Sequence, residues 1–131
     1  MLRKEILIST LESLGASQDL LGDFDLHSTV EIELDSGISI FISDIDGHIW
    51  LWSKVDFINS YNIDANASNL LSLLMEVRPL MLTGQYILGR IDERYEFKAL
   101  LSDEALSSAE NLAYVLESFY SDLMELKSIC S

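Results

Sequence analysis

Basic residues are missing from a long first stretch of this chain. Between Glu5 and Ser53 the sequence holds ten acidic residues and no lysine or arginine, and the net charge of the whole chain is −14. Such a field repels nucleic-acid phosphates and anionic membrane surfaces, and it attracts basic partners. We therefore expect no nucleic acid and no membrane among the partners. A merely solvating acidic surface and a steering role both remain open.

Cysteine and proline are almost absent as well. Cys130 is the single cysteine, which excludes an internal disulfide and fits a reducing compartment. We interpret it as an incidental thiol, because a nucleophile needs a positioned base. One proline and 49% hydrophobic residues favour a compact fold over disorder, and the length of 131 residues suits a single domain, 1–131.

Long apolar runs are also lacking. No stretch approaches the roughly 18 apolar residues of a membrane span. Met1–Lys4 followed by apolar residues faintly resembles a secretory signal, but Glu5 and Glu12 interrupt it and the leucines recur at helical spacing. The sequence predicts a cytosolic protein.

Motifs for catalysis, cofactors and metals are missing too. The scattered glycines form no phosphate-binding loop. Asp44–Gly47 hints at a calcium loop, but Val55 stands where the twelfth position requires glutamate, so a hairpin turn is favoured. His27 and His48 have no metal-ligand spacing. Because no nucleophile, base and oxyanion donor assemble, we predict a protein that is not an enzyme, with no catalytic residue, cofactor or metal.

Three short strands are predicted between Asp25 and Val55. Apolar residues alternate with polar ones, which is the pattern of strands with one buried face. Asp35-Ser36-Gly37 separates the first two strands, and Asp46-Gly47 predicts a type I′ hairpin between the second and third. The expected buried residues are Val30, Ile32, Leu34, Ile38, Ile40, Ile42, Ile49 and Leu51.

Helices and two more strands complete the prediction. A first helix, Leu2–Leu14, ends at Gly15, and a polar connection, Asn59–Asn69, precedes a second helix over 70–77. Pro79 marks the end of that helix. The remaining elements are strands over Gln85–Ile91 and Tyr95–Leu101 and a last helix over Ser102–Lys127, capped by Ser102-Asp103. The fold class is α+β, in the order α-β-β-β-α-β-β-α, with a five-stranded, mainly antiparallel sheet and three helices.

Two features predict binding surfaces. Trp50 and Trp52 share one face of the third strand, and Phe41 is expected beside them. These rings are either core beneath a helix or an open patch for a peptide. The helix over 70–77 is apolar nearly all round and needs cover on both sides. Burial within one chain is possible, but a homodimer interface is favoured, because so small a domain has little to wrap it.

The segment Leu20–Thr29, followed by Ile49-Trp50-Leu51-Trp52, resembles the type III secretion chaperones of the invasion and surface-presentation systems, often called class IB. The shared features are an Asp-x-His-Ser entry to the first strand and the Trp-x-Trp strand. The Leu-Gly pair in the fourth strand and Phe119-Tyr120 in the last helix agree with it.

This resemblance implies a homodimeric chaperone of the bacterial cytoplasm without ATPase activity. Such chaperones bind a segment near the N-terminus of one or more secreted effectors in extended form and keep it secretion-competent. They help deliver it to the secretion apparatus, with contact to the secretion ATPase through the effector complex. An unfolded client loses chain entropy when it is ordered, so a large interface is required.

Site residues follow as hypotheses. Effector binding is assigned to Leu7, Leu11, Leu14, Phe41, Trp50 and Trp52. The dimer interface is assigned to Leu70, Leu71, Leu74, Val77, Tyr86 and Leu88. An alternative from another class is an acidic inhibitor or immunity-type protein that covers a basic site on a partner.

Overall fold

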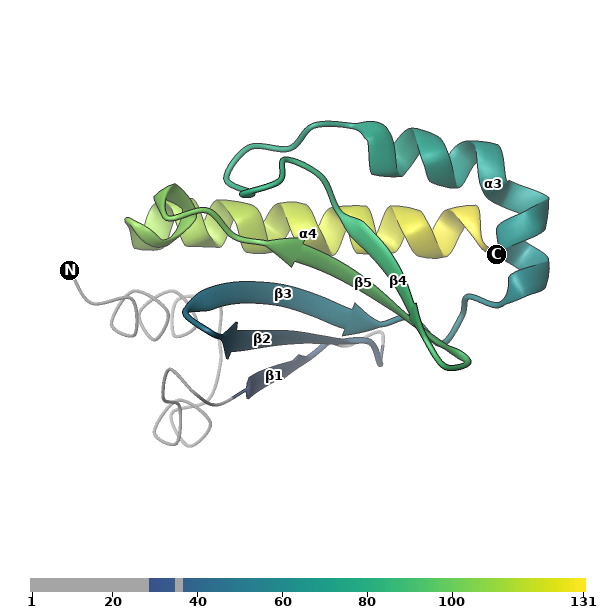
Figure 1. Ribbon diagram of the computed structural model, residues 1–131, viewed down its shortest axis with the longest axis horizontal. Coiled ribbons are helices and arrows are strands. Elements are labelled where there is room, and N and C mark those ends of the chain that lie inside the picture. Colours follow the sequence, from purple (N-terminus) through teal and green to yellow (C-terminus); the bar gives the residue numbers. More distant parts are fainter. Residues whose placement is uncertain (1–28, 35–36) are drawn as a thin grey trace.

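The computed structural model describes residues 29–34 and 37–131, and the predicted helix over Leu2–Leu14 lies outside this range. Within these residues five strands form one sheet in the order β1-β2-β3-β5-β4, and every neighbouring pair is antiparallel (Figure 1). The predicted α+β class and the order of strands and helices from the first strand onward are therefore confirmed. The strands are β1 (Thr29–Glu33), β2 (Ser39–Ile45), β3 (His48–Lys54), β4 (Ile87–Ile91) and β5 (Arg94–Leu100).

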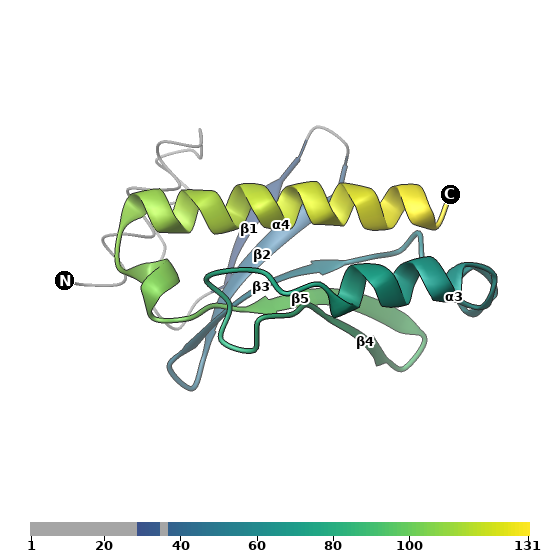
Figure 2. The ribbon, with the colours of Figure 1, turned by 90° about the horizontal axis from the view of Figure 1, so that it is seen from above.

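In the described part of the chain, two α-helices, α3 (Ser60–Met75) and α4 (Ala109–Ile129), lie on the same side of the sheet (Figures 1 and 2). The core fills the space between them and the strands, and Phe97 of β5 and Phe119 of α4 pack there with ring centroids 5.4 Å apart. We call the side of the sheet that faces α4 its inner face and the opposite side its outer face. The alternation predicted for the first three strands is confirmed. The fully buried residues are Val30, Ile40, Ile42, Ile49 and Leu51, and the half-buried ones, packed against the core, are Ile32, Leu34 and Ile38.

The hairpin predicted from Asp46-Gly47 is present between β2 and β3. Both residues have positive φ, 54° and 83°, as a type I′ turn requires. The backbone N–H of Gly47 donates to Oδ1 of Asp44 at 2.9 Å, which closes the turn. The turn fixes the register that places Phe41 opposite Trp52 and Ser43 opposite Trp50.

The second helix begins ten residues earlier than its predicted body, because the asparagine-rich stretch is helical rather than a connection. Asn59 is the N-cap, and its side chain and that of Asn62 accept hydrogen bonds from each other's backbone N–H at 2.9 Å. Asn66 interrupts the helix with φ −123° and donates to the carbonyl of Asn62, which produces the bend visible in Figure 1. The helix ends at Met75, ahead of Pro79 as predicted.

The last helix begins later than predicted. Residues 102–107 contain the 3₁₀ turn η1 (Glu104–Leu106), and Ser108 caps α4 by accepting a hydrogen bond from the N–H of Asn111 at 3.0 Å. The cap predicted at Ser102-Asp103 therefore belongs to the turn. On α4 the side chain of Tyr120 is exposed, although it directly follows buried Phe119. Asp122, by contrast, is buried. Among the residues described, no helix is long and apolar enough to cross a membrane.

Candidate binding surfaces

Aromatic side chains occupy the outer face of the sheet. Phe41 of β2 stacks on Trp52 of β3 with centroids 4.3 Å apart and planes 19° from parallel. The ammonium of Lys54 lies 5.5 Å from the centroid of the Phe41 ring. Trp50 and Trp52 are both half-buried, and α3 and α4 lie on the opposite side of the sheet. The structure thus brings Phe41, Trp50 and Trp52 together, whereas Leu7, Leu11 and Leu14 lie outside the described residues.

Ser43 fixes the position of this cluster. It is buried at 4% exposure although it lies on the outer face. Its hydroxyl oxygen accepts from the indole N–H of Trp52 at 2.9 Å and hydrogen-bonds the hydroxyl of Thr29 at 2.8 Å. With its N–H satisfied and its ring stacked, Trp52 is held in one orientation before any partner arrives.

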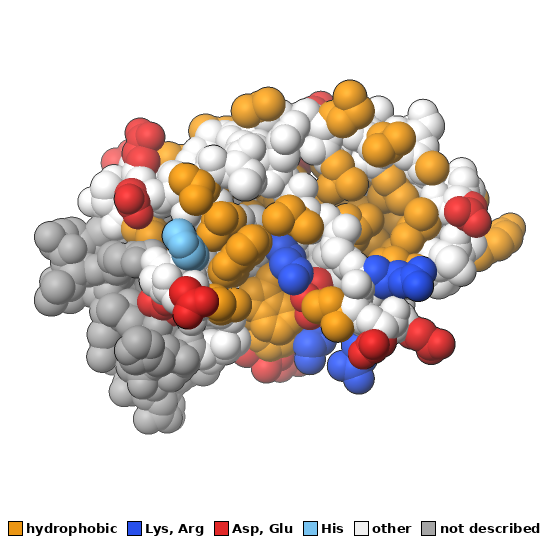
Figure 3. All heavy atoms as spheres, in the orientation of Figure 1, with side chains coloured by type: hydrophobic (Ala, Val, Ile, Leu, Met, Phe, Trp, Pro, Cys, Tyr) orange, Lys and Arg blue, Asp and Glu red, His pale blue; other side chains and the backbone are white. Residues whose placement is uncertain are grey.

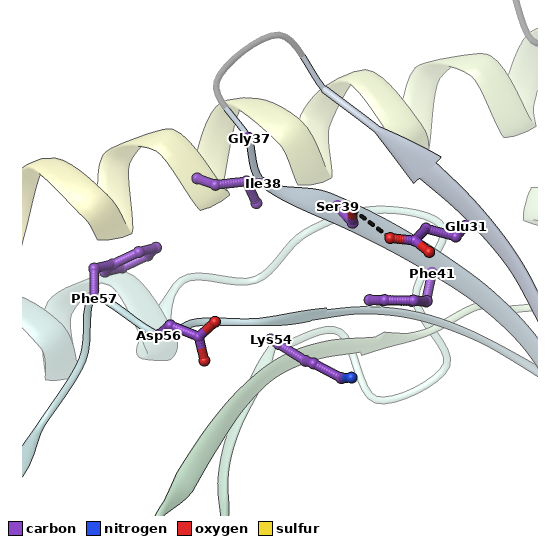
Figure 4. A pocket seen from close by; sticks show the side chains of 8 residues that line it. All are labelled: Glu31, Gly37, Ile38, Ser39, Phe41, Lys54, Asp56 and Phe57. Atoms are coloured by element: carbon purple, nitrogen blue, oxygen red, sulfur yellow. Dashed lines mark hydrogen bonds between the residues drawn. The ribbon is translucent and has the colours of Figure 1, made fainter.

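Two hollows flank the aromatic stack. One, of about 310 Å³, lies between Glu31, Phe41, Lys54 and Phe57, and Figure 4 shows these side chains around it. The other, of about 450 Å³, lies between Thr29, Trp50, Trp52 and Lys98. Each hollow has an aromatic wall and charged groups at its rim, an arrangement that suits side chains of an extended peptide.

A second apolar surface covers the end of α3, the segment 76–86 and β4. We call it the α3–β4 surface. Hydrophobic side chains gather over α3 and β4 in Figure 3. Its exposed hydrophobic members are Leu71 at 57%, Met75 at 68%, Val77 at 76%, Leu82 at 59%, Ile87 at 39% and Ile91 at 51%. The residues assigned to a dimer interface from the sequence do not include Met75, Leu82 and Ile87. Met75 and Ile87 lie within the predicted helix and strand, and Leu82 lies between them, so their apolar character was a usable signal.

The residues assigned to a dimer interface differ in how far their side chains are exposed. Leu71 and Val77 are exposed, and Leu74 and Leu88 are half-buried. Leu70 and Tyr86 are 4% and 5% exposed, so their side chains belong to the core of this chain. The predicted interface therefore centres on Leu71 and Val77, with Leu70 and Tyr86 beneath it.

An ion pair between Arg78 and Asp122 connects the segment 76–86 to α4. The guanidinium of Arg78 donates through Nε to Oδ2 of Asp122 at 2.9 Å and through a second nitrogen to Oδ1 at 3.1 Å. The hydroxyl of buried Tyr86 donates to the same carboxylate. The backbone N–H of Arg78 donates to the carbonyl of Gly84 at 2.7 Å, which closes the segment on itself. This network, which the sequence analysis did not anticipate, holds the α3–β4 surface in shape.

Because of this network, the stability of the fold should decrease with rising pH in the alkaline range. Burial raises the pKa of Tyr86 far above its usual value, and the hydrogen bond to Asp122 raises it further. A raised folded-state pKa contributes stability that is complete below the unfolded pKa of about 10 and is lost as the pH rises above it. We expect urea midpoints to fall more steeply above pH 10 for the natural chain than for Tyr86→Phe. Parallel pH profiles of the two proteins would contradict this expectation.

The described residues contain no group of three or more His, Cys, Asp or Glu side chains that would hold a metal ion. His48 is exposed on β3, at the hairpin turn. Cys130 is buried, and burial raises the pKa of its thiol. A buried thiol with a raised pKa is a poor nucleophile.

Comparison with known proteins gives consistent matches. The model of the invasion protein B family matches residues 15–92, from ahead of β1 to the end of β4. The surface presentation of antigens protein SpaK of Salmonella typhimurium is 31% identical over 119 residues, which cover 91% of this chain and 88% of that protein. SpaK of Salmonella typhi matches with the same identity and coverage.

Proposed function

Because the chain belongs to the invasion protein B family, we propose that it is a type III secretion chaperone of the bacterial cytoplasm. In this proposal it binds the N-terminal segment of one or more secreted effectors in extended form. It keeps them stable and secretion-competent and helps deliver them to the secretion apparatus, with contact to the secretion ATPase through the effector complex.

The observation that supports this proposal most is the outer face of the sheet. The stacked pair of Phe41 and Trp52 separates two hollows, and Trp52 is already oriented by Ser43. An extended segment crossing the face can place side chains in both hollows while its main chain contributes hydrogen bonds elsewhere. Because main-chain hydrogen bonds do not depend on side-chain identity, such a surface accepts more than one client.

We further propose that the protein acts as a homodimer through the α3–β4 surface. Exposed side chains such as Leu71, Met75 and Val77 lie close together there, and a surface of this kind usually marks a contact with another protein. A dimer would offer two outer faces to one client. That doubling increases the interface that compensates for the ordering entropy of the client.

The test is capture of clients from the native bacterium. The tagged chain is expressed at its natural level, purified with its bound proteins and treated with protease, and the protected fragments are identified by mass spectrometry. The proposal predicts protected segments near the N-termini of secreted proteins. Capture of a folded protein with no protected segment, lost steeply as salt is raised, would instead indicate an acidic inhibitor of a basic site.

Trp50→Ala tests the outer face directly. Trp50 is half-buried and lines the larger hollow, so its removal should weaken client binding about 30-fold, the effect of an interface hot spot. The melting temperature should change little, because the ring is not in the core. His48→Ala, on the same strand and exposed, is the control and should bind normally. If Trp50→Ala unfolds the chain, the ring is core and the assignment is wrong.

A further inference from the structure

The segment 76–86 leaves α3 and enters β4 with its two arms in contact. The backbone N–H of Arg78 in the first arm donates to the carbonyl of Gly84 in the second at 2.7 Å. A methyl group added at Gly84 would meet Cγ1 of Val77 at 3.4 Å, so the Val77 side chain lies against the second arm. The segment carries Val77 and Leu82, both exposed, and the shape of the α3–β4 surface therefore depends on its being closed.

The middle of the segment has a conformation that its residue type disfavours. Leu80 has a φ of 68°, a left-handed conformation that costs free energy in a residue with a bulky side chain. The carbonyl of Leu80 accepts from the backbone N–H of Ser102 at 3.0 Å. The N–H of Leu82 donates to the carbonyl of Leu100 at 2.8 Å. A strained conformation persists only while its surroundings impose it, so weakening these surroundings should let the segment open.

One carboxylate on α4 holds both arms of the segment. Asp122 accepts from two nitrogens of Arg78 in the first arm and from the hydroxyl of Tyr86 where the second arm ends. Asp122 and Tyr86 are buried within the single chain, so neither side chain is available to contact a second copy. Any effect that they have on dimerisation must therefore act through the position of other residues.

We propose that Arg78, Asp122 and Tyr86 are positioning residues of the dimer interface. This inference rests on the homodimer of the proposed function. Their hydrogen bonds keep the segment closed, and the closed segment presents Val77 and Leu82 to the second copy in one arrangement. A chain whose segment is open for part of the time binds its partner more weakly in proportion to the closed fraction. By linkage, dimerisation in turn favours the closed segment.

The first experiment measures the dimer dissociation constant of full-length variants by sedimentation velocity. Tyr86→Phe removes one buried hydroxyl and changes nothing on the surface. Arg78→Lys keeps the charge, but its single nitrogen cannot reproduce the two-nitrogen contact with the Asp122 carboxylate. We expect the dissociation constant to rise about threefold for Tyr86→Phe and about tenfold for Arg78→Lys. Unchanged constants in both variants would overturn the proposal.

Ile42→Val is the control for a loss of stability alone. Ile42 is 1% exposed on β2, which is separated from β4 by β3 and β5. Removing one buried methylene-sized group there should lower the urea midpoint to an extent comparable with Tyr86→Phe. Its dimer dissociation constant should equal that of the natural chain. If Ile42→Val weakens the dimer as much as Tyr86→Phe does, the network has only a structural role and the proposal is wrong.

The second experiment follows hydrogen exchange of the Ser102 amide by NMR. This amide reports opening because it donates to the carbonyl of Leu80, and Ser102 lies outside the α3–β4 surface. In the natural chain its exchange should slow as the protein concentration rises and dimers form. At concentrations where both proteins are monomers, exchange should be faster in Arg78→Lys. Identical exchange in the two proteins, with no dependence on concentration, would contradict the proposed coupling.

The outcomes distinguish this inference from the proposed function. A natural chain that is monomeric at all concentrations would remove the homodimer and the inference together. If the natural chain dimerises and both variants dimerise equally well, the homodimer stands and the positioning role is wrong. If Arg78→Lys does not fold, Tyr86→Phe decides, because it retains the ion pair and loses only a hydroxyl.

Discussion

Asp122→Ala will lower the free energy of unfolding by about 3 kcal/mol, because it leaves the buried hydroxyl of Tyr86 without its acceptor and the partly buried guanidinium of Arg78 without its bidentate partner. The side chain of Asp122 is 10% exposed, and that of Arg78 is 22% exposed. Removing the carboxylate leaves the Arg78 guanidinium with Glu76 as its one side-chain partner among the described residues, and the hydroxyl of Tyr86 without the partner it has in the core. Urea denaturation followed by circular dichroism measures the loss.

Glu76→Ala is the matched control for Asp122→Ala. It removes the other carboxylate that contacts Arg78, at 2.6 Å, but the side chain of Glu76 is 61% exposed. Exposed pairs contribute less than about 1 kcal/mol, so this variant should be nearly as stable as the natural chain. Equal losses in the two variants would show that the buried pair has no special role.

Combining Arg78→Met, Asp122→Leu and Tyr86→Phe should restore much of the stability, since a packed apolar set can replace a buried ion pair.

Leu71→Glu combined with Val77→Glu will convert the proposed homodimer into monomers. Both side chains are more than half exposed in the single chain, so the fold itself should tolerate the change. Each contributes roughly 1.5 kcal/mol or more when buried in an interface, and a buried unpaired carboxylate adds a further cost. The dissociation constant should rise about a hundredfold or more. Sedimentation velocity over a range of concentrations measures it.

The control for this pair is Tyr114→Glu with Tyr120→Glu. These tyrosines are exposed on α4, at 52% and 41%, and the charge change is the same. This variant should sediment like the natural chain. A natural chain that is monomeric at all concentrations, or a Leu71→Glu, Val77→Glu variant that stays dimeric, would remove the α3–β4 surface from the interface.

Local signals in the sequence predicted the strands well. Between two alternating segments, Asp46-Gly47 strongly indicates a two-residue hairpin turn. The hairpin was predicted from it, and the alternation along the strand after it placed Trp50 and Trp52 on one face of the sheet. The start of α3 was predicted wrongly because asparagine is in general a poor helix former. Asn59 and Asn62 here form a reciprocal cap that depends on the exact geometry of the turn.

The buried ion pair was beyond sequence reasoning for a different reason. Asp122 lies on the apolar stripe of α4, three residues after Phe119, and a charged residue there suggests a solvent-facing position. Its partner Arg78 is 44 residues away in the chain, and only the folded path of the segment 76–86 brings them together. The outer face was half predicted: its aromatic residues were named, but the hollows beside them and the role of Ser43 depend on side-chain packing.

Both tryptophans of the chain lie on the outer face of β3. The protein therefore contains its own optical probe, because all of its indole emission arises from the surface proposed to receive the client. Trp52 is stacked and hydrogen-bonded, so Trp50 should account for most of any spectral change on binding. Exchange between clients can then be followed in real time with an unlabelled chain, and Trp50→Phe provides the spectrum in which that change is absent.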